Sequence, residues 1–138
     1  ADFIVSPHLC GKIAELCNLR KISYIPGCGS VSEVVEAQAM GVEIIKIFPG
    51  VEVGGKSFIK NVLGPMPWIG MLPAGGVANT QKNIFEWLEA VACGLAMGSS
   101  LIPKGSRSKK DLLKIEENVK DALGFIKGAK GKLKDGKG

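Results

Sequence analysis

The chain has 138 residues, of which 46% are hydrophobic, and this size and composition are typical of one globular domain with a buried core. No apolar run approaches the ~20 residues of a membrane helix, and the first ten residues lack the marks of an export signal, so we expect a cytoplasmic protein that contacts no membrane. The net charge of +5 lies mainly in residues 127–138, with five lysines and one aspartate. The other 126 residues carry only +1, which argues against a nucleic-acid partner.

Five short apolar segments alternate with longer segments whose apolar residues recur at helical spacing. The predicted strands are 3–7 (FIVSP), 24–27 (YIPG), 43–50 (EIIKIFPG), 69–76 (IGMLPAGG) and 93–100 (CGLAMGSS). The predicted helices are Leu9–Leu19, Ser30–Met40, Lys56–Leu63, Gln81–Ala90 and Lys109–Ile126. This alternation predicts an α/β fold with a parallel sheet, and the nearly continuous apolar strands predict cover on both faces. The order fits a doubly wound sheet or a barrel, but no G-x-G-x-x-G motif indicates a dinucleotide site.

The sequence also marks several helix ends. Ser30 and Glu33 have the spacing of a capping box, and Gly41 is placed to end the helix that Ser30 begins. Asn79 or Thr80 is expected to cap the fourth helix. The Gly/Lys-rich residues 128–138 hold too few apolar side chains to offset the entropy of ordering, so we expect them to be disordered, or to serve as a basic tail that binds anions.

Lys46 stands among apolar residues in EIIKIFPG. On a strand covered on both faces its ammonium would lose solvation, and the neutral amine favoured there is the nucleophile that attacks a ketone or aldehyde to form a Schiff base. A lysine on an edge strand, or one whose amine reaches solvent past its apolar stem, fits the same eight residues equally well. The pattern alone leaves both interpretations open.

Two further groups of residues lie at predicted strand ends. Gly75, Gly76, Gly98 and Ser99 follow the last two strands, where backbone N–H groups can converge on a phosphate, although a Gly-Gly pair is also an ordinary turn. Pro7 and Pro26 end earlier strands as pocket walls or simple terminators. His8 and the scattered cysteines have no spacing typical of a metal site, so we expect none.

Taken together, five motifs closely resemble the 2-keto-3-deoxy-6-phosphogluconate (KDPG) / 4-hydroxy-2-oxoglutarate (KHG) aldolase family. They are FIVSPHL, YIPGCGSVSEV, IKIFPG, GPMPWIGMLPAGGV and AMGSSLIPKG, in this order along residues 1–105. The resemblance implies a (β/α)8 TIM barrel, a homotrimer, and a class I aldolase that needs no metal or other cofactor because pyruvate is held as a covalent imine on a lysine.

The resemblance also implies roles for individual residues. Lys46 matches the Schiff-base lysine, and Phe48 matches an aromatic residue that packs against the substrate. Pro7 and Pro26 match prolines that line the pocket. The matches to the phosphate-binding strand ends are Gly75, Gly76, Gly98 and Ser99. Ala74 stands where the family commonly has threonine, which removes a hydroxyl donor near the substrate and implies a changed preference for the acceptor aldehyde.

The motifs begin at the family's fourth strand. Residues 1–127 are therefore expected to form the last five βα units of a barrel, with strands four to eight, and the family's acid/base glutamate and substrate-binding arginine are expected to lie outside this sequence. The chain would then be a partial sequence, a cleaved or misassigned chain, or a barrel completed by another segment. Its two open sheet edges predict association.

The implied reaction is cleavage of KDPG, a keto-acid phosphate, to pyruvate and glyceraldehyde 3-phosphate in the Entner-Doudoroff route. KHG aldolase activity uses the same lysine without a phosphate site. A fragment without catalysis, which binds phosphate or assembles with other chains, is the alternative from another functional class.

Overall fold

The computed structural model describes residues 1–106 and 108–135. Its strands are β1 (Phe3–Val5), β2 (Ser23–Ile25), β3 (Gly27–Cys28), β4 (Ile44–Ile47) and β5 (Gly70–Pro73). Its helices are α1 (Gly11–Arg20), α2 (Val31–Ala39), α3 (Gly55–Leu63), α4 (Gln81–Glu89) and α5 (Lys109–Asp135). The alternation expected from the sequence is present, so the α/β class is confirmed.

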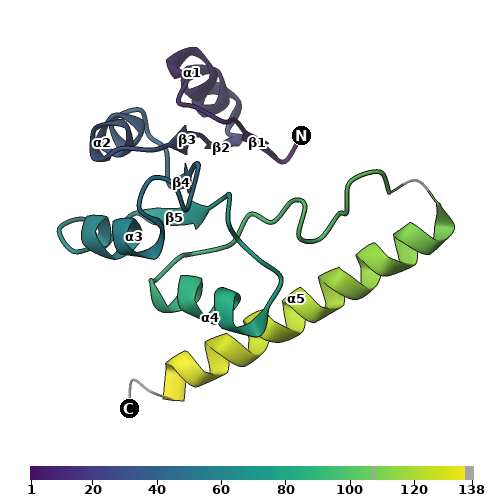
Figure 1. Ribbon diagram of the computed structural model, residues 1–138. Helices are drawn as coiled ribbons and strands as arrows, with labels where there is room; N and C mark the ends of the chain where they lie inside the picture. The colour runs from purple at the N-terminus through teal and green to yellow at the C-terminus, as the bar shows by residue number, and fades with distance from the viewer. Residues whose placement is uncertain (107, 136–138) are drawn as a thin grey trace.

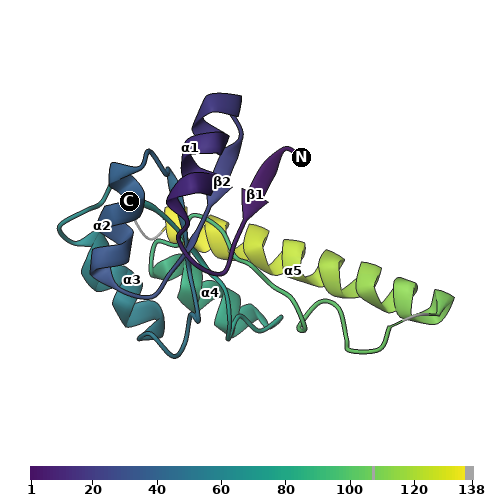
Figure 2. The same cartoon turned by 90° about the horizontal axis from the view of Figure 1, so that it is seen from above.

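The strands form a parallel layer that follows the order of the chain. β1 pairs with β2, and β4 lies between β3 and β5. Pro26 separates β2 from β3 because it has no N–H to donate. Two hydrogen bonds cross this break, from Gly27 N to Ser6 O at 3.0 Å and from Lys46 N to Pro26 O at 2.9 Å. Helices α1 to α4 follow one another around one side of this layer (Figures 1 and 2).

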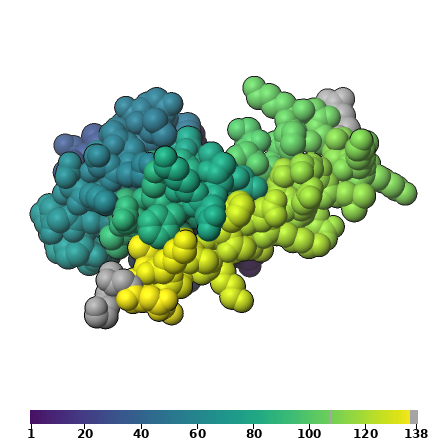
Figure 3. Space-filling view, turned by 60° about the horizontal axis from the view of Figure 1, so that its bottom comes forward, coloured from purple at the N-terminus to yellow at the C-terminus, as the bar shows by residue number. Residues whose placement is uncertain are grey.

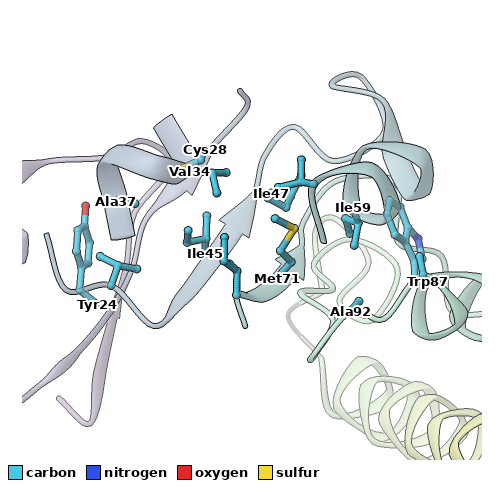
Figure 4. Packing of buried hydrophobic residues seen from close by; sticks show 14 of the residues in the cluster. Tyr24, Cys28, Val34, Ala37, Ile45, Ile47, Ile59, Met71, Trp87 and Ala92 are labelled. Carbon is cyan, nitrogen blue, oxygen red and sulfur yellow. The ribbon is translucent and has the colours of Figure 1, made fainter. Parts of the chain in front are cut away.

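The core lies between this layer and its helices. Ile45 and Ile47 of β4 are fully buried, whereas Ile44 and Lys46, which point to the opposite face, are only half-buried. Figure 4 shows Ile45, Ile47 and Met71 in the middle of the buried cluster, with Tyr24 at one end and Trp87 at the other. The expectation that both faces of β4 are covered is therefore wrong in the described part of the chain.

The fifth predicted strand, 93–100, is also absent as a regular strand among the described residues. The segment makes a single parallel bridge, Ala74 with Ala96, and donates from Cys93 N to Met71 O and from Ala96 N to Pro73 O. Gly94 and Gly98 offer no side chains to pack, and glycine raises the entropy lost on forming a strand. The segment therefore follows β5 without forming a full ladder.

The predicted helix ends agree closely with the structure. Ser30 Oγ accepts a hydrogen bond from Glu33 N at 3.3 Å, which confirms the cap of α2. Thr80 Oγ1 accepts from Asn83 N at 3.3 Å at the start of α4. Gly41 follows Met40, the C-cap of α2, and adopts φ = +80°, the left-handed conformation that glycine tolerates best at a helix end.

Helix α5 corrects the expected disorder of residues 128–138. It continues through Asp135, nine residues beyond the predicted end at Ile126, while residues 136–138 lie outside the described part. Phe125, Ala129 and Leu133 recur every four residues and pack against α4. Figure 3 shows the yellow C-terminal part of α5 lying against α4. This packing supplies apolar contacts that the Gly/Lys-rich composition does not suggest.

Candidate functional site

Lys46 lies on β4, one residue before the strand ends. Its backbone pairs in register with Gly27 of β3 on one side and Leu72 of β5 on the other. The Lys46 ammonium lies 4.4 Å from the centre of the Phe48 ring, and Phe48 is 38% exposed. The lysine is therefore half-buried beside an aromatic face at the carboxyl end of a central strand, where parallel sheets carry their sites.

The two candidate wall prolines approach this strand through Gly27. Pro26 is fully buried and precedes Gly27 directly, while Pro7 is exposed in the loop after β1. A Cβ atom on Gly27 would lie 2.1 Å from the Pro7 carbonyl oxygen, so only glycine lets the two loops touch here. The structure thus brings Pro7 and Pro26 to the strand next to Lys46.

The loop after β4, which carries Gly50 and Val51, contacts the loop after β5, which carries Gly75 and Gly76. Gly50 N donates to Ala74 O at 2.7 Å, and Ala74 itself is buried. Gly75 and Gly76 adopt φ values of +93° and +74°, which disfavour any residue with a side chain. A Cβ on Gly76 would lie only 2.0 Å from a methyl carbon of Val51. Gly75 and Gly76 are exposed, so their backbones face the solvent at the end of β5.

The segment with Gly98 and Ser99 joins the same edge. Ser100 Oγ donates to Val77 O at 3.0 Å, one residue after Gly76, and Gly98 O accepts from the N–H groups of Leu101 and Ile102 at 2.9 Å each. Gly98 and Ser99 are exposed. The loop after β5 and the segment with Gly98 and Ser99, which were predicted to share one rim, are therefore joined directly.

Other polar residues take structural places. Glu33 Oε2 accepts from Gly29 N at 2.8 Å and from Ser30 Oγ, and these hydrogen bonds lower the pKa of the Glu33 carboxyl. Burial, followed by the charges of nearby glutamates, raises the pKa of the Cys28 thiol to about 11, so it is protonated near neutral pH. Within residues 1–106 and 108–135, no group of three His, Cys, Asp or Glu residues is close enough to hold a metal ion.

The sequence did not point to Ser6 and Tyr24, two residues that lie beside the candidate site. Their hydroxyl oxygens lie 2.7 Å apart, and both side chains are buried beneath the loop that carries Pro7. The signal available in the sequence was the placement of each residue near the carboxyl end of one of two consecutive strands, since such ends meet at one edge of a parallel sheet.

The family model for KDPG and KHG aldolases matches residues 1–118. The chain belongs to this aldolase family. A 2-dehydro-3-deoxy-phosphogluconate aldolase of Haemophilus influenzae is 32% identical over 130 residues, which cover 92% of this chain and 59% of the relative. The chain spans between 55% and 59% of the length of the first three curated relatives.

Solved aldolase structures agree with this family assignment. A KDPG aldolase of Legionella pneumophila, with pyruvate captured at low pH as a covalent carbinolamine intermediate, is 29% identical with a TM-score of 0.70. The match covers 86% of this chain and 56% of that one. A KDPG aldolase of Zymomonas mobilis with 3-phosphoglycerate is 25% identical, has a TM-score of 0.74, and is matched over 91% of this chain and 57% of its own.

No helix within the described residues of this aldolase family member is long and apolar enough to cross a membrane. Its four cysteines, Cys10, Cys17, Cys28 and Cys93, are free thiols.

Proposed function

We propose that this chain carries the covalent centre of a class I aldolase that cleaves KDPG to pyruvate and glyceraldehyde 3-phosphate. The observation that carries the proposal is the half-buried Lys46, placed beside Phe48 near the carboxyl end of the central strand β4, at the side of the sheet where the proline and glycine loops lie. The relatives named KDPG aldolases support the substrate, and the carbinolamine captured in the Legionella enzyme supports covalent chemistry with pyruvate.

The reaction begins with the side-chain amine of Lys46. The amine adds to the C2 carbonyl of the keto acid, and loss of water from the carbinolamine leaves an iminium. A base removes the proton of the C4 hydroxyl, the C3–C4 bond breaks, and its electron pair moves into the iminium to give an enamine and the aldehyde. Protonation at C3 and hydrolysis then release pyruvate and restore the lysine. No external cofactor enters these steps.

The surrounding residues divide between the two ends of the substrate. Pro7, Pro26, Phe48 and Ala74 line the pyruvyl end in this proposal, with the Phe48 ring packing against the bound keto acid. The exposed backbones of Gly75, Gly76 and Gly98, together with Ser99, receive the phosphate, because glycine lets N–H groups approach an anion closely. The catalytic carboxylate is assigned to a part of the whole protein outside this sequence.

The proposed fold of the whole protein is a (β/α)8 barrel in which residues 1–127 supply strands four to eight. The sequential parallel order of the strands and the placement of α1 to α4 on one side support it. A doubly wound sheet would need helices on both faces. A cytoplasmic homotrimer completes the proposal, and the free thiols suit a reducing compartment.

Trapping with pyruvate and borohydride tests the covalent step. We expect intact mass and peptide mapping to locate a reduced pyruvate adduct on Lys46. Lys46→Met should lose the adduct, whereas Lys56→Met, the matched control on α3, should keep it. An unmodified Lys46, or an adduct spread over many lysines, would contradict the proposal and leave the reading of a binding or assembly fragment without catalysis.

KHG aldolase activity is a second candidate, because the matching family model covers both activities. It uses Lys46 but needs no phosphate group on the substrate. Comparing turnover of KDPG and KHG by the whole protein separates the two. A Ser99→Ala substitution should raise the KM for KDPG and leave the KM for KHG unchanged if the phosphate assignment is correct.

A further inference from the structure

The hydroxyl groups of Ser6 and Tyr24 form hydrogen bonds within the loop between β1 and α1, residues 6–10. Tyr24 Oη accepts a hydrogen bond from Cys10 N at 3.2 Å and donates its single proton to Ser6 Oγ at 2.7 Å, while His8 O lies 3.2 Å away. The Ser6 hydroxyl in turn donates to His8 O at 2.5 Å. One hydroxyl pair therefore fixes the loop at both of its ends and in its middle.

The two hydroxyl side chains of this network are buried, whereas its backbone partners in the loop, His8 and Cys10, are closer to the surface. Ser6 is 8% exposed and Tyr24 is 6% exposed. A buried polar group that loses its partner carries the full penalty of desolvation. A phenylalanine at position 24 would fill the same space in the core but would leave Ser6 and Cys10 N without this partner. The position of the loop therefore depends on the Tyr24 hydroxyl rather than on the Tyr24 ring.

The loop also contacts Gly27 of β3, the strand next to Lys46. Gly27 N donates to Ser6 O at 3.0 Å, and the Pro7 carbonyl oxygen lies so close to Gly27 that no Cβ would fit between them. Gly27 is the register partner of Lys46. Gly27 therefore joins the loop to the strand that pairs with the backbone of Lys46.

We propose that Ser6 and Tyr24 are positioning residues, whose shared hydrogen bonds hold the Pro7 loop against Gly27 and so shape the pocket for the pyruvyl group beside Lys46. This inference rests on the proposed function. The Tyr24 ring belongs to the buried cluster on the helix-covered face of the sheet, and Lys46 points to the opposite face. Tyr24 acts through the loop and not on the reacting atoms.

The test uses the full chain with Tyr24→Phe, Ser6→Ala and the double substitution. Borohydride trapping over a range of pyruvate concentrations gives the half-saturating concentration and the maximal rate. We expect each single substitution to raise the half-saturating concentration roughly three- to tenfold with little change in the maximal rate, the size of one lost hydrogen bond. The double variant should resemble the singles, because both act through one network.

Two further measurements separate positioning from a general loss of stability. Hydrogen exchange followed by mass spectrometry should show faster exchange in residues 6–10 of both variants. Ser108→Ala is the matched control, since it removes an exposed hydroxyl that accepts from Asp111 N at 3.2 Å at the start of α5. We expect that control to leave both the trapping curve and the exchange of residues 6–10 unchanged.

The inference is overturned if the unaltered chain forms the adduct and the variants give superimposable trapping curves, or if the two effects add fully in the double variant. A drop confined to the maximal rate and the melting temperature also overturns it, because that pattern reports stability alone. Absence of any adduct in the unaltered chain contradicts the proposed function itself, and it is seen before any substitution is made.

Discussion

At the scale of single residues, the glycines of the site are not equivalent. Gly76 has φ = +74° and faces Val51 so closely that a Cβ would overlap its methyl group at 2.0 Å. Gly98 has no atom within 4 Å of the position of a Cβ. Both are proposed to approach the same phosphate, yet only Gly76 is required by the backbone and by its neighbour. The fold therefore requires glycine at position 76 but not at position 98, where only the proposed phosphate would favour it.

Gly76→Ala should destabilise the protein by about 2 kcal/mol or more, from left-handed backbone strain and the overlap with Val51. Gly98→Ala should change the free energy of unfolding by less than about 0.5 kcal/mol. Urea unfolding of both variants with an unchanged m-value checks this. Adding Val51→Ala to Gly76→Ala should recover part of the loss, and equal stability of the two single variants would contradict the argument.

At the scale of elements, α5 shows how spacing can outweigh composition. Its last eight residues, 128–135, are rich in glycine and lysine, and they are still helical. Ala129 is 4% exposed and Leu133 packs against the same cluster as Ile84 and Leu88 of α4. Leu123, on the same helix, is 61% exposed. The face toward α4 therefore holds the end of α5 in place.

Two leucine substitutions on α5 test this packing. Leu133→Ala should cost about 1 to 2 kcal/mol, because the lost side chain is partly buried against α4. Leu123→Ala should cost less than about 0.5 kcal/mol, since most of that side chain already faces water. Hydrogen exchange of residues 129–135 should rise only in the first variant. A disordered end of the chain would show rapid exchange in the unaltered protein as well.

At the scale of the whole molecule, the sheet exposes apolar side chains on its first strand, β1. Phe3 and Val5 on β1 are 57% and 46% exposed, and within the described residues β1 pairs only with β2. An exposed apolar edge strand presents free backbone groups to another strand. In the proposed barrel, this edge is covered by a neighbouring strand of the whole protein. In the isolated chain, it is open to association.

We therefore expect the chain by itself to associate in a concentration-dependent way, as measured by sedimentation velocity. Val5→Lys should reduce that association, because a lysine on an edge strand disfavours pairing with a second strand. Leu19→Lys, on α1 and 73% exposed in the unaltered chain, is the control and should have little effect. A monomer at every concentration, or equal effects of both variants, would contradict the role of the β1 edge.

The sequence predicted the elements better than their extent. Ser30, Glu33, Thr80 and Gly41 marked helix ends correctly, because capping depends on a few neighbouring residues. Residues 93–100 form no regular strand and residues 128–135 are ordered, since ladder formation and helix packing depend on partners far along the chain. The roles of Lys46 and the residues around it stay predictions.

The sequence by itself determined the alternation of strands and helices, the helix caps, and the family resemblance that the family model confirmed over residues 1–118. These follow from local periodicity and short motifs. Only the tertiary structure decided that Lys46 is half-buried beside Phe48, that Pro7 contacts Gly27, and that Tyr24 and Ser6 hold that loop. Such contacts join residues on different strands, so they depend on register and sheet order, which local sequence does not encode.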